Sequence, residues 1–474
     1  MLFCSQAYLV FLASVFALYW AIPWHRVRVW LLLAASIAFY ASWNQWLALL
    51  IVASTTIDYV LARWIDASAS ARLRKALLVV SVCGNLGLLG YFKYANFFLA
   101  SLNAGLAALG VEHSFSLLQV ILPIGISFYT FEAINYMVDV YRRRIPAERS
   151  LPDLLLFITF FPHLVAGPIV RARDFLPQIR RPKRWDWARI NLGVQLLLLG
   201  TFKKLAIADR MACFVDPIFE HPAMYPSHAH WMAMFAYALQ IYGDFSGYTD
   251  MALGSAHLLG YKLTKNFDMP YLARNIADFW RRWHMSLSSW LRDYLFIPLG
   301  GSRCAPMRTA LNLMATMTLA GLWHGASWTF VVWGALHGVW LVGHRAFSDV
   351  VGARPRLERA FQTNIATMGC VLATFLTVTF SWVLFRAPDF GTALEFWAGL
   401  FSSSGAMRSP VHPSGLLLTY AMAIGGYWVA LQPQFRRWTR TLPAPVAGMG
   451  YATVASLAAV LAPASGKVFI YFQF

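Results

Sequence analysis

The chain has 474 residues, of which 59% are hydrophobic and only 13% are charged. Soluble domains keep about a quarter of their residues charged, so this composition excludes an ordinary soluble globular protein. The formal net charge of +18 is concentrated in short connecting segments, which indicates anchoring on the cytoplasmic side of a membrane and not nucleic-acid binding. The five cysteines show no paired spacing, so neither a disulfide framework nor a metal site is expected.

A membrane-spanning helix needs about 20 mostly apolar residues, and the sequence offers roughly ten to twelve such stretches. It therefore predicts an all-α, polytopic membrane protein with re-entrant and interfacial helices in addition to the spans. A single membrane-embedded domain is expected over residues 1–474. Within it, residues 1–119 carry no recognisable motif, residues 120–345 form the expected catalytic core, and residues 346–474 supply the last helices and a tail.

One apolar segment, residues 154–169, does not fit a simple crossing. The basic loops at residues 142–149 and 171–189 both belong on the cytoplasmic side, so the segment between them begins and ends on that side. Pro162 and Pro168 supply the helix breaks that such a path needs. We therefore expect a re-entrant segment here.

The basic region at residues 262–308 is unusual because large apolar side chains recur in it at helical spacing. This pattern is typical of an amphipathic helix at the membrane interface. A continuous helix would place His284 and Ser288, four residues apart, on one face. The apolar positions are Trp280, Trp283, Leu287, Trp290 and Tyr294.

Two histidines lie inside otherwise apolar sequence, His284 in WRRWHMSLSSW and His324 in GLWHGASW. An ionisable residue at membrane depth is costly, so a functional role is its default interpretation. Imidazole is also the side chain that exchanges a proton near neutral pH unaided. The competing interpretation, a buried histidine that only satisfies hydrogen bonds, is the one we expect for His163, His337 and His344.

Several ordered motifs resemble those of the membrane-bound O-acyltransferase family, in the branch of bacterial alginate O-acetyltransferases. They cover most of the chain from about residue 122 onward. The motifs are LPIGISFYTFEAINYMVDVYRRR from Leu122, FFPHLVAGPIVRARDFLPQI from Phe160, IYGDFSGYTDMALG from Ile241, DFWRRWHMSLSSWLRDYLFIPLGGSR from Asp278, GLWHGASWTFVVWGALHG from Gly321 and the final FIYFQF.

The resemblance implies helices around a central tunnel, with a catalytic histidine at the position of His324 and a second functional position at His284. It implies acetyl-CoA as the acyl donor, used as a substrate with no permanently bound cofactor or metal. It also implies a periplasmic, esterase-like (SGNH) acetyltransferase as the partner that completes transfer to a polysaccharide.

The residues are consistent with that chemistry. A thioester is already activated, so its transfer needs a base for the acceptor's proton and donors for the tetrahedral oxyanion. Neutral His324 can serve as the base, while His284 can either orient the thioester carbonyl or act as a second proton carrier. Gly321 and Gly325 flank His324, and we expect them to leave room for an acyl chain or pantetheine arm.

Charged residues near the motifs have two interpretations each. Asp244 and Asp250 either line the path of the acceptor or pair structurally with arginines of residues 281–292. Three basic residues at the expected cytosolic mouth either bind the phosphates of the coenzyme or anchor the chain to lipid headgroups. These are Arg281, Arg282 and Lys265.

The sequence ends on FIYFQF, from Phe469. A similar aromatic ending with a tyrosine occurs on a small partner peptide of the Gram-positive D-alanylation machinery, where the tyrosine is proposed to receive the acyl group. By this resemblance, Tyr471 is a catalytic residue that accepts acetyl from the tunnel and passes it to the extracytoplasmic transferase. The alternative is an aromatic anchor at the membrane interface.

The leading prediction is a bacterial inner-membrane acyltransferase that moves acetyl from cytosolic acetyl-CoA across the bilayer. Its product would be an O-acetylated extracytoplasmic polysaccharide, alginate-like, with cellulose or peptidoglycan as alternatives. Within the enzyme class, the alternative is a D-alanyl transferase for teichoic acid. From a different class, a proton-coupled secondary transporter would use the histidines as a proton relay, but such a protein is expected to show inverted repeats, and none is found in the sequence.

Overall fold

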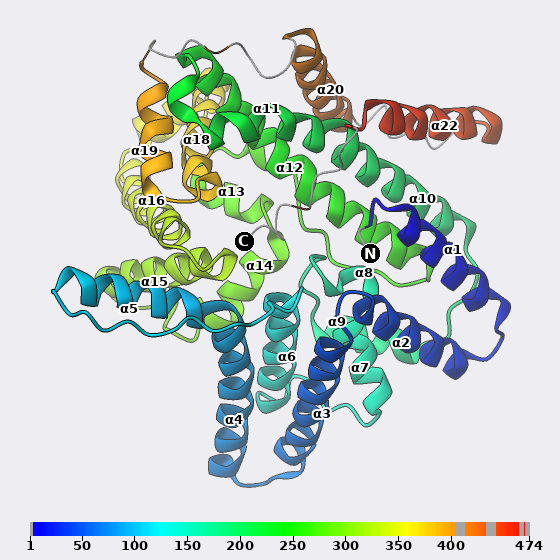
Figure 1. Ribbon diagram of the computed structural model, residues 1–474. Coiled ribbons are helices and arrows are strands. Elements are labelled where there is room, and N and C mark those ends of the chain that lie inside the picture. The colour runs from blue at the N-terminus through cyan, green and yellow to red at the C-terminus, as the bar shows by residue number, and fades with distance from the viewer. Residues whose placement is uncertain (1–2, 403–406, 408–412, 433–441, 464–468, 470–474) are drawn as a thin grey trace. The chain divides into compact units, whose positions relative to one another are not determined.

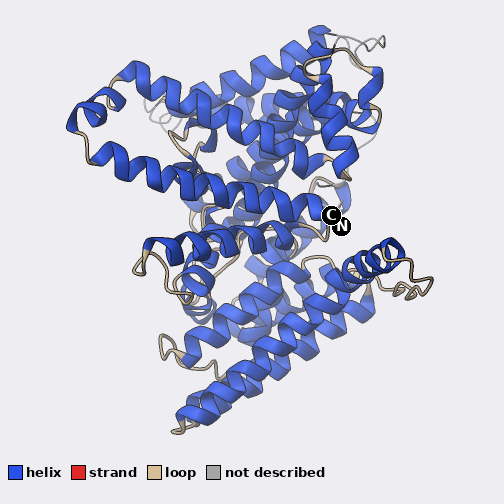
Figure 2. Cartoon of the chain, turned by 90° about the vertical axis from the view of Figure 1, so that its left-hand side faces the viewer, coloured by secondary structure: helices blue, strands red, loops and turns tan. Residues whose placement is uncertain are grey.

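The computed structural model describes residues 1–474 except 1–2, 403–406, 408–412, 433–441, 464–468 and 470–474. Throughout this part of the chain the structure consists of helices joined by loops, without a strand (Figures 1 and 2). The predicted all-α class is therefore confirmed.

The chain forms two compact units. The first comprises residues 1–194 and 252–264, and the second comprises residues 195–251 and 265–474. Of the three boundaries, those after residues 194 and 251 fall within the helices α10 and α12, and the one after residue 264 falls in a loop; none lies at residue 119 or 345, where the sequence suggested divisions. The expectation that the chain acts as one membrane domain stays a prediction.

The first unit is built from helices joined mostly by short loops, with a long loop between α5 and α6. Its elements are α1 (Gln6–Ala21), α2 (His25–Ala41), α3 (Gln45–Ala67), α4 (Ala71–Leu89), the π-helix η1 (Gly90–Tyr94), α5 (Ala95–Ala108), α6 (Ile126–Tyr141), α7 (Leu151–Thr159), α8 (Phe161–Leu164), α9 (Ala172–Arg180) and the first part of α10 (Trp187–Phe202).

The second unit carries the remaining helices. They are the π-helix η2 (Lys203–Ala208), α11 (Asp209–Glu220), η3 (Pro222–Met224), α12 (Ser227–Leu258), η4 (Pro270–Leu272), α13 (Ile276–Arg282), α14 (Met285–Leu291), the π-helix η5 (Arg292–Phe296), α15 (Pro306–His324), α16 (Trp328–Gly352), α17 (Pro355–Phe361), α18 (Asn364–Arg386), α19 (Phe390–Gly399), α20 (Pro413–Leu431) and α22 (Ala444–Leu461). The last turns of α12 belong to the first unit.

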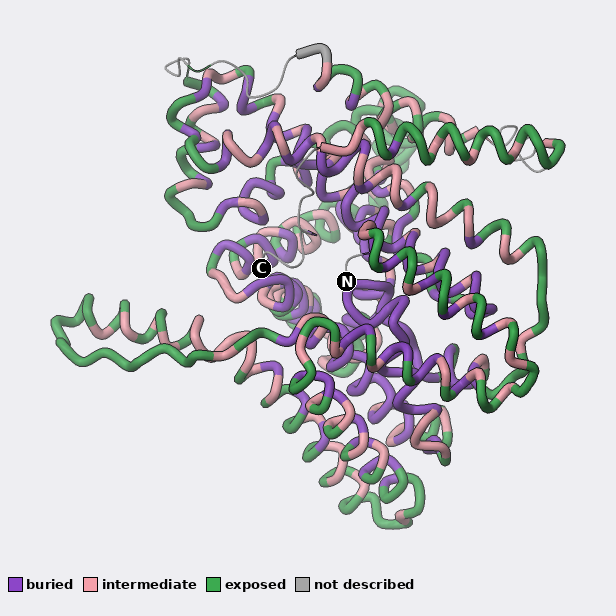
Figure 3. The backbone as a smooth tube through the Cα atoms, turned by 45° about the vertical axis from the view of Figure 1, so that its right-hand side comes forward, coloured by how far each residue is buried: buried purple, intermediate pink, exposed green. Residues whose placement is uncertain are grey.

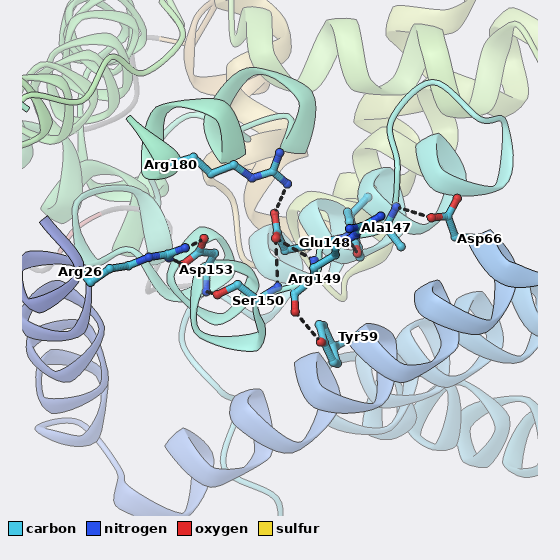
Figure 4. A network of polar contacts seen from close by, with 10 residues as sticks. Arg26, Tyr59, Asp66, Ala147, Glu148, Arg149, Ser150, Asp153 and Arg180 are labelled. Atoms are coloured by element: carbon cyan, nitrogen blue, oxygen red, sulfur yellow. Dashed lines mark hydrogen bonds and ion pairs between the residues drawn. The ribbon is translucent and has the colours of Figure 1, made fainter. Parts of the chain in front are cut away.

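Burial within the first unit centres on α6, which is covered along nearly its whole length, whereas α5 has no buried residue (Figure 3). The loop after α6 is held by a polar network around Glu148 (Figure 4). The Glu148 carboxylate accepts hydrogen bonds from the backbone N–H groups of Arg149 and Ser150 and pairs with Arg180. Such contacts satisfy a carboxylate that is only 2% exposed.

Five helical stretches in the described part of the chain are long and apolar enough to cross a membrane, and two shorter apolar helices accompany them. The multi-pass class is thus confirmed, while the larger number of spans stays a prediction. The five stretches are Gln45–Ala67, Ala71–Ala108, Trp187–Glu220, Asn364–Arg386 and Ala444–Leu461, and the shorter helices are Gln6–Ala21 and Gly415–Leu431.

The segment predicted to be re-entrant is broken. Helix α7 ends at Thr159, and after Phe160 the four-residue helix α8 starts, with Pro162 in its first turn. Proline is tolerated there because the first backbone N–H groups of a helix have no partner within the helix. The break that the prolines predicted is present, and the path of the segment relative to a membrane stays a prediction.

The prediction of one continuous amphipathic helix around residues 280–294 is wrong. Helix α13 ends at Arg282, and α14 starts at Met285 after His284, whose φ of 44° lies in the left-handed region. Few residues other than glycine adopt this conformation, and they need support from their surroundings. His284 and Ser288 therefore do not share one face of a regular helix, because His284 caps the start of α14.

Candidate active site

His324 is the last residue of α15, at the point where the chain turns into α16. The turn is short because Ser327 caps α16, its side chain accepting a hydrogen bond from the backbone N–H of Thr329. His324 is 3% exposed, and its ring lies against Trp333 and Phe385, with centroids 5.4 and 5.2 Å away. The imidazole is therefore packed between aromatic rings.

The glycines beside His324 serve a different purpose from the one predicted. A Cβ atom on Gly321 would lie 2.2 Å from the Phe330 backbone oxygen, and one on Gly325 would lie 2.2 Å from the Phe330 ring. Gly334 on α16 would meet the Met317 backbone oxygen in the same way. The space beside Gly321 and Gly325 is thus filled by α16 and that beside Gly334 by α15, and the expectation that Gly321 and Gly325 leave room for an acyl chain is wrong.

The structure brings His284 and His324 together within the second unit. Their ring centroids are 6.3 Å apart, with an angle of 58° between the ring planes. Trp323 lies near both imidazoles, and Phe245 from α12 meets His284 edge-on at 4.7 Å. Two histidines that are 40 positions apart in sequence therefore form one buried pair.

Asn266 contacts His284 directly. The Asn266 Oδ1 atom lies 3.1 Å from His284 Nδ1 and accepts hydrogen bonds from both the backbone N–H (3.2 Å) and the hydroxyl (2.9 Å) of Ser286. The Asn266 amide nitrogen faces the hydroxyl of Thr249 at 3.5 Å. This residue was not predicted from sequence, because 18 positions separate it from His284 and no short motif joins them.

Burial of His284 has a pH-dependent consequence. His284 lies outside the candidate spans, and burial lowers its pKa from the ordinary 6.5 to about 3. Above pH 6.5 the ring is neutral in both the folded and the unfolded chain. Between pH 6.5 and 3 only the unfolded chain takes up the proton. The free energy of unfolding therefore falls as the pH decreases, by up to about 1.4 kcal/mol for each pH unit.

We expect the His284→Gln variant to lose less stability than the wild type as the pH decreases, because glutamine does not take up a proton. The measurement is the thermal midpoint of the detergent-solubilised protein between pH 7.5 and 5, with the exposed His228→Gln as the matched control. The control should follow the wild type. Identical slopes for all three proteins would contradict a buried, neutral His284.

The predicted coenzyme-binding residues lie on the surface of the second unit. Lys265 is 60% exposed and pairs with Asp268 at 2.6 Å, while Arg282 pairs with Asp278 at 3.0 Å. Arg281 is exposed. Two of the three cations are thus partly neutralised by neighbouring carboxylates, and phosphate binding by these residues stays a prediction.

Asp244 and Asp250 are paired, but not with the arginines expected from sequence. Lys204 Nζ lies 2.8 Å from Asp244 Oδ1 and 2.8 Å from Asp209 Oδ1, and all three side chains are at most 8% exposed. Lys203 pairs with Asp250 at 2.6 Å. The partners come from the π-helix η2, so the structural interpretation of the carboxylates is supported and the predicted partners are wrong.

Of the histidines assigned to structural roles, His337 has a hydrogen-bond partner at both ring nitrogens. His337 Nδ1 accepts from the Trp280 indole N–H at 3.3 Å, and its Nε2 lies 3.1 Å from the Ser381 hydroxyl. His163 Nδ1 lies 3.2 Å from Glu132 Oε1 inside the first unit. His344 is only partly buried and lies 3.5 Å from the Ser348 hydroxyl.

The predicted acyl acceptor Tyr471 lies outside the described residues. Phe469, two positions earlier, is described and is only 2% exposed. Its ring stacks on Tyr248 with centroids 4.4 Å apart and lies 6.2 Å from Phe245, the ring that contacts His284. This part of the tail therefore lies one aromatic ring away from the histidine pair.

Comparison with known proteins identifies the class. Residues 139–383, more than half of the chain, match the membrane-bound O-acyltransferase (MBOAT) family. The chain therefore belongs to this family and is a multi-pass membrane O-acyltransferase.

Individual relatives are bacterial. A probable alginate O-acetylase of Azotobacter vinelandii is 43% identical over 405 residues, covering 85% of this chain and 78% of the relative. A peptidoglycan O-acetyltransferase of Helicobacter pylori is 37% identical, covering 80% and 74%. A teichoic acid D-alanyltransferase of Bacillus subtilis is 28% identical over 280 residues, covering 56% and 69%. The resemblance to the alginate O-acetylase branch is thus confirmed, and a transporter is not supported.

Proposed function

We propose that this enzyme takes acetyl from cytosolic acetyl-CoA and delivers it across the bacterial inner membrane for O-acetylation of an extracytoplasmic polysaccharide. The observation that carries the proposal is the buried His284–His324 pair, 6.3 Å between ring centroids, in a member of an O-acyltransferase family. The 43% and 37% identical relatives are named for O-acetyl transfer, which favours acetyl over D-alanyl as the group moved. The polymer is alginate-like, with peptidoglycan as the second candidate.

The chemistry requires a base that takes the acceptor's proton. One imidazole removes the proton from the acceptor hydroxyl while its oxygen attacks the thioester carbon. The carbon–sulfur bond then breaks, and the coenzyme A thiolate takes up the proton. His324 is the proposed base, at the end of α15. Access of the thioester and the acceptor along a tunnel is part of this proposal.

The test uses purified protein in liposomes with acetyl-CoA labelled on the acetyl group. Wild-type protein should release free coenzyme A, and label should reach the acceptor when the periplasmic esterase-like partner and alginate oligosaccharide are supplied. Turnover with a D-alanyl carrier protein instead would support the teichoic acid alternative. No thioester cleavage with either donor would reject the proposal.

The tail is the proposed intermediate acceptor. The support for this proposal is Phe469, two positions before Tyr471 in the sequence, whose ring stacks on Tyr248 and lies 6.2 Å from Phe245. The phenol oxygen would take the acetyl group from the thioester and pass it to the hydroxyl of the partner enzyme. An interfacial anchor would need no such chemistry.

We expect Tyr471→Phe to abolish acetyl transfer to the partner and to remove the acetyl mass shift from the tail peptide. Phenylalanine keeps the aromatic ring but lacks the nucleophilic oxygen. The measurements are mass spectrometry of the tail peptide and polysaccharide acetylation, with Tyr451→Phe on α22 as the matched control. Full polysaccharide acetylation by Tyr471→Phe would leave the tail with an anchoring role only.

A further inference from the structure

The hydrogen-bond partners of His284 determine which of its two ring nitrogens carries the proton. Asn266 Oδ1 faces three groups: His284 Nδ1, the Ser286 hydroxyl and the Ser286 backbone N–H. A backbone N–H can only donate a hydrogen bond, so the Asn266 atom that it meets must be the oxygen and not the amide nitrogen. The position of the Asn266 nitrogen near the Thr249 hydroxyl agrees with this orientation.

The oxygen of an amide only accepts hydrogen bonds, so the His284 nitrogen facing it must carry hydrogen. Neutral His284 is therefore protonated on Nδ1, and Nε2 carries the lone pair. A neutral imidazole in this form cannot donate a hydrogen bond from Nε2 to a thioester carbonyl. It can accept a proton there.

The backbone around His284 is clamped by the same segment. The Met285 N–H donates to the Asn266 backbone oxygen at 2.9 Å, and the Asp268 N–H donates to the Arg282 backbone oxygen at 2.9 Å. These bonds flank the left-handed His284 on both sides. Asn266 thus supports both the strained backbone and the orientation of the ring.

We propose that Asn266 is a positioning residue that holds His284 as its Nδ1–H tautomer and so makes His284 a proton acceptor, not a hydrogen-bond donor to the thioester carbonyl. The inference deepens the proposed function and rests on it for the reaction itself. The proton that His324 takes from the acceptor hydroxyl passes to His284 Nε2 and leaves with the coenzyme A thiolate, so His284 is the second proton carrier of the pair. The choice between the two roles considered for His284 therefore follows from a side chain 18 positions away.

Two substitutions at Asn266 separate positioning from simple structural support. Asn266→Asp keeps an accepting oxygen and adds a negative charge beside the ring, which favours protonated His284. The neighbours of the ring include the uncharged Phe245 of α12 and, from α15, Trp323 and the titratable His324. We expect the acid limb of the pH–rate profile to move upward by about one to three pH units.

Asn266→Leu removes the accepting oxygen, so that the proton of neutral His284 is no longer held on Nδ1. We expect kcat for coenzyme A release to fall about 10- to 1000-fold, because a general base contributes about 100- to 10,000-fold and is here only partly lost. KM for acetyl-CoA should stay nearly unchanged. The matched control is Asn312→Leu, a buried asparagine of the same unit that donates to the Gly301 backbone oxygen at 3.2 Å.

The results expected are a shifted profile for Asn266→Asp, a low kcat for Asn266→Leu, and neither effect for Asn312→Leu. An unshifted profile for Asn266→Asp, or equal losses in both Asn266 variants, would overturn the inference. A second readout needs no turnover: the pH dependence of the thermal midpoint of Asn266→Asp, with and without His284→Ala. Coupling between the two positions there would support the contact even if wild-type protein cleaved no thioester, which would reject only the proposed function.

Discussion

Replacing His324 with alanine is expected to lower the rate of coenzyme A release from acetyl-CoA by about 100- to 10,000-fold, the usual contribution of a general base. The substitution removes the proton acceptor at the end of α15 while leaving the Gly321–Gly334 approach of α15 and α16 in place. The helical hairpin should therefore stay folded. The measurement is thiol release under saturating acetyl-CoA in liposomes.

The matched control for this experiment is His344→Ala. His344 lies on α16 and is partly exposed, so its loss should leave thiol release near the wild-type rate. Circular dichroism and the thermal midpoint of both variants check that folding is retained. If folded His324→Ala released coenzyme A at the wild-type rate, the base would have to be sought elsewhere.

Replacing Lys204 with methionine is expected to reduce the free energy of unfolding by about 3–5 kcal/mol, the typical cost of removing one partner from a buried ion pair. Lys204 lies between Asp209 and Asp244, whose side chains are 2% and 4% exposed. Without the ammonium group, two carboxylates of like charge remain buried near each other. We expect low yield and a lower thermal midpoint in detergent.

An exposed ion pair of the same unit provides the control. Lys265→Met breaks the pair with Asp268, in which the side chains are 60% and 52% exposed, and should cost less than about 1 kcal/mol. Partial rescue of Lys204→Met by a second change, Asp244→Asn, would attribute the loss to uncompensated charge. Equal midpoints for Lys204→Met and Lys265→Met would contradict the importance of burial.

The sequence was sufficient to predict the class of fold and the family, because each depends on local signals, and it singled out two histidines whose roles stay a prediction. Long apolar stretches indicate spans, and an imidazole between apolar runs is conspicuous. The proximity of His284 and His324, with ring centroids 6.3 Å apart, was not predicted and is a finding of the structure.

The errors arose where contacts between distant segments determine the local structure. Regular spacing of aromatic residues predicted one helix through His284, but hydrogen bonds that Asn266 accepts from His284 and Met285 hold a left-handed residue there. Asp244 was expected to pair with an arginine, since no local pattern showed that Lys204 faces it from η2. Glycine beside a catalytic position also has two explanations, ligand access and close helix packing, and only coordinates separate them for Gly321.

The π-helix η2 limits how this part of the sequence can vary in length. Its wider turn, Lys203–Ala208, lets two consecutive lysines each pair with a carboxylate of α12. A π-helical turn amounts to one extra residue in an α-helix, and consecutive residues of an α-helix point roughly 100° apart. Losing a single residue here would convert the stretch to a plain α-helical turn and change which side chains face α12. We therefore expect such a deletion to separate one of the two lysines from its carboxylate.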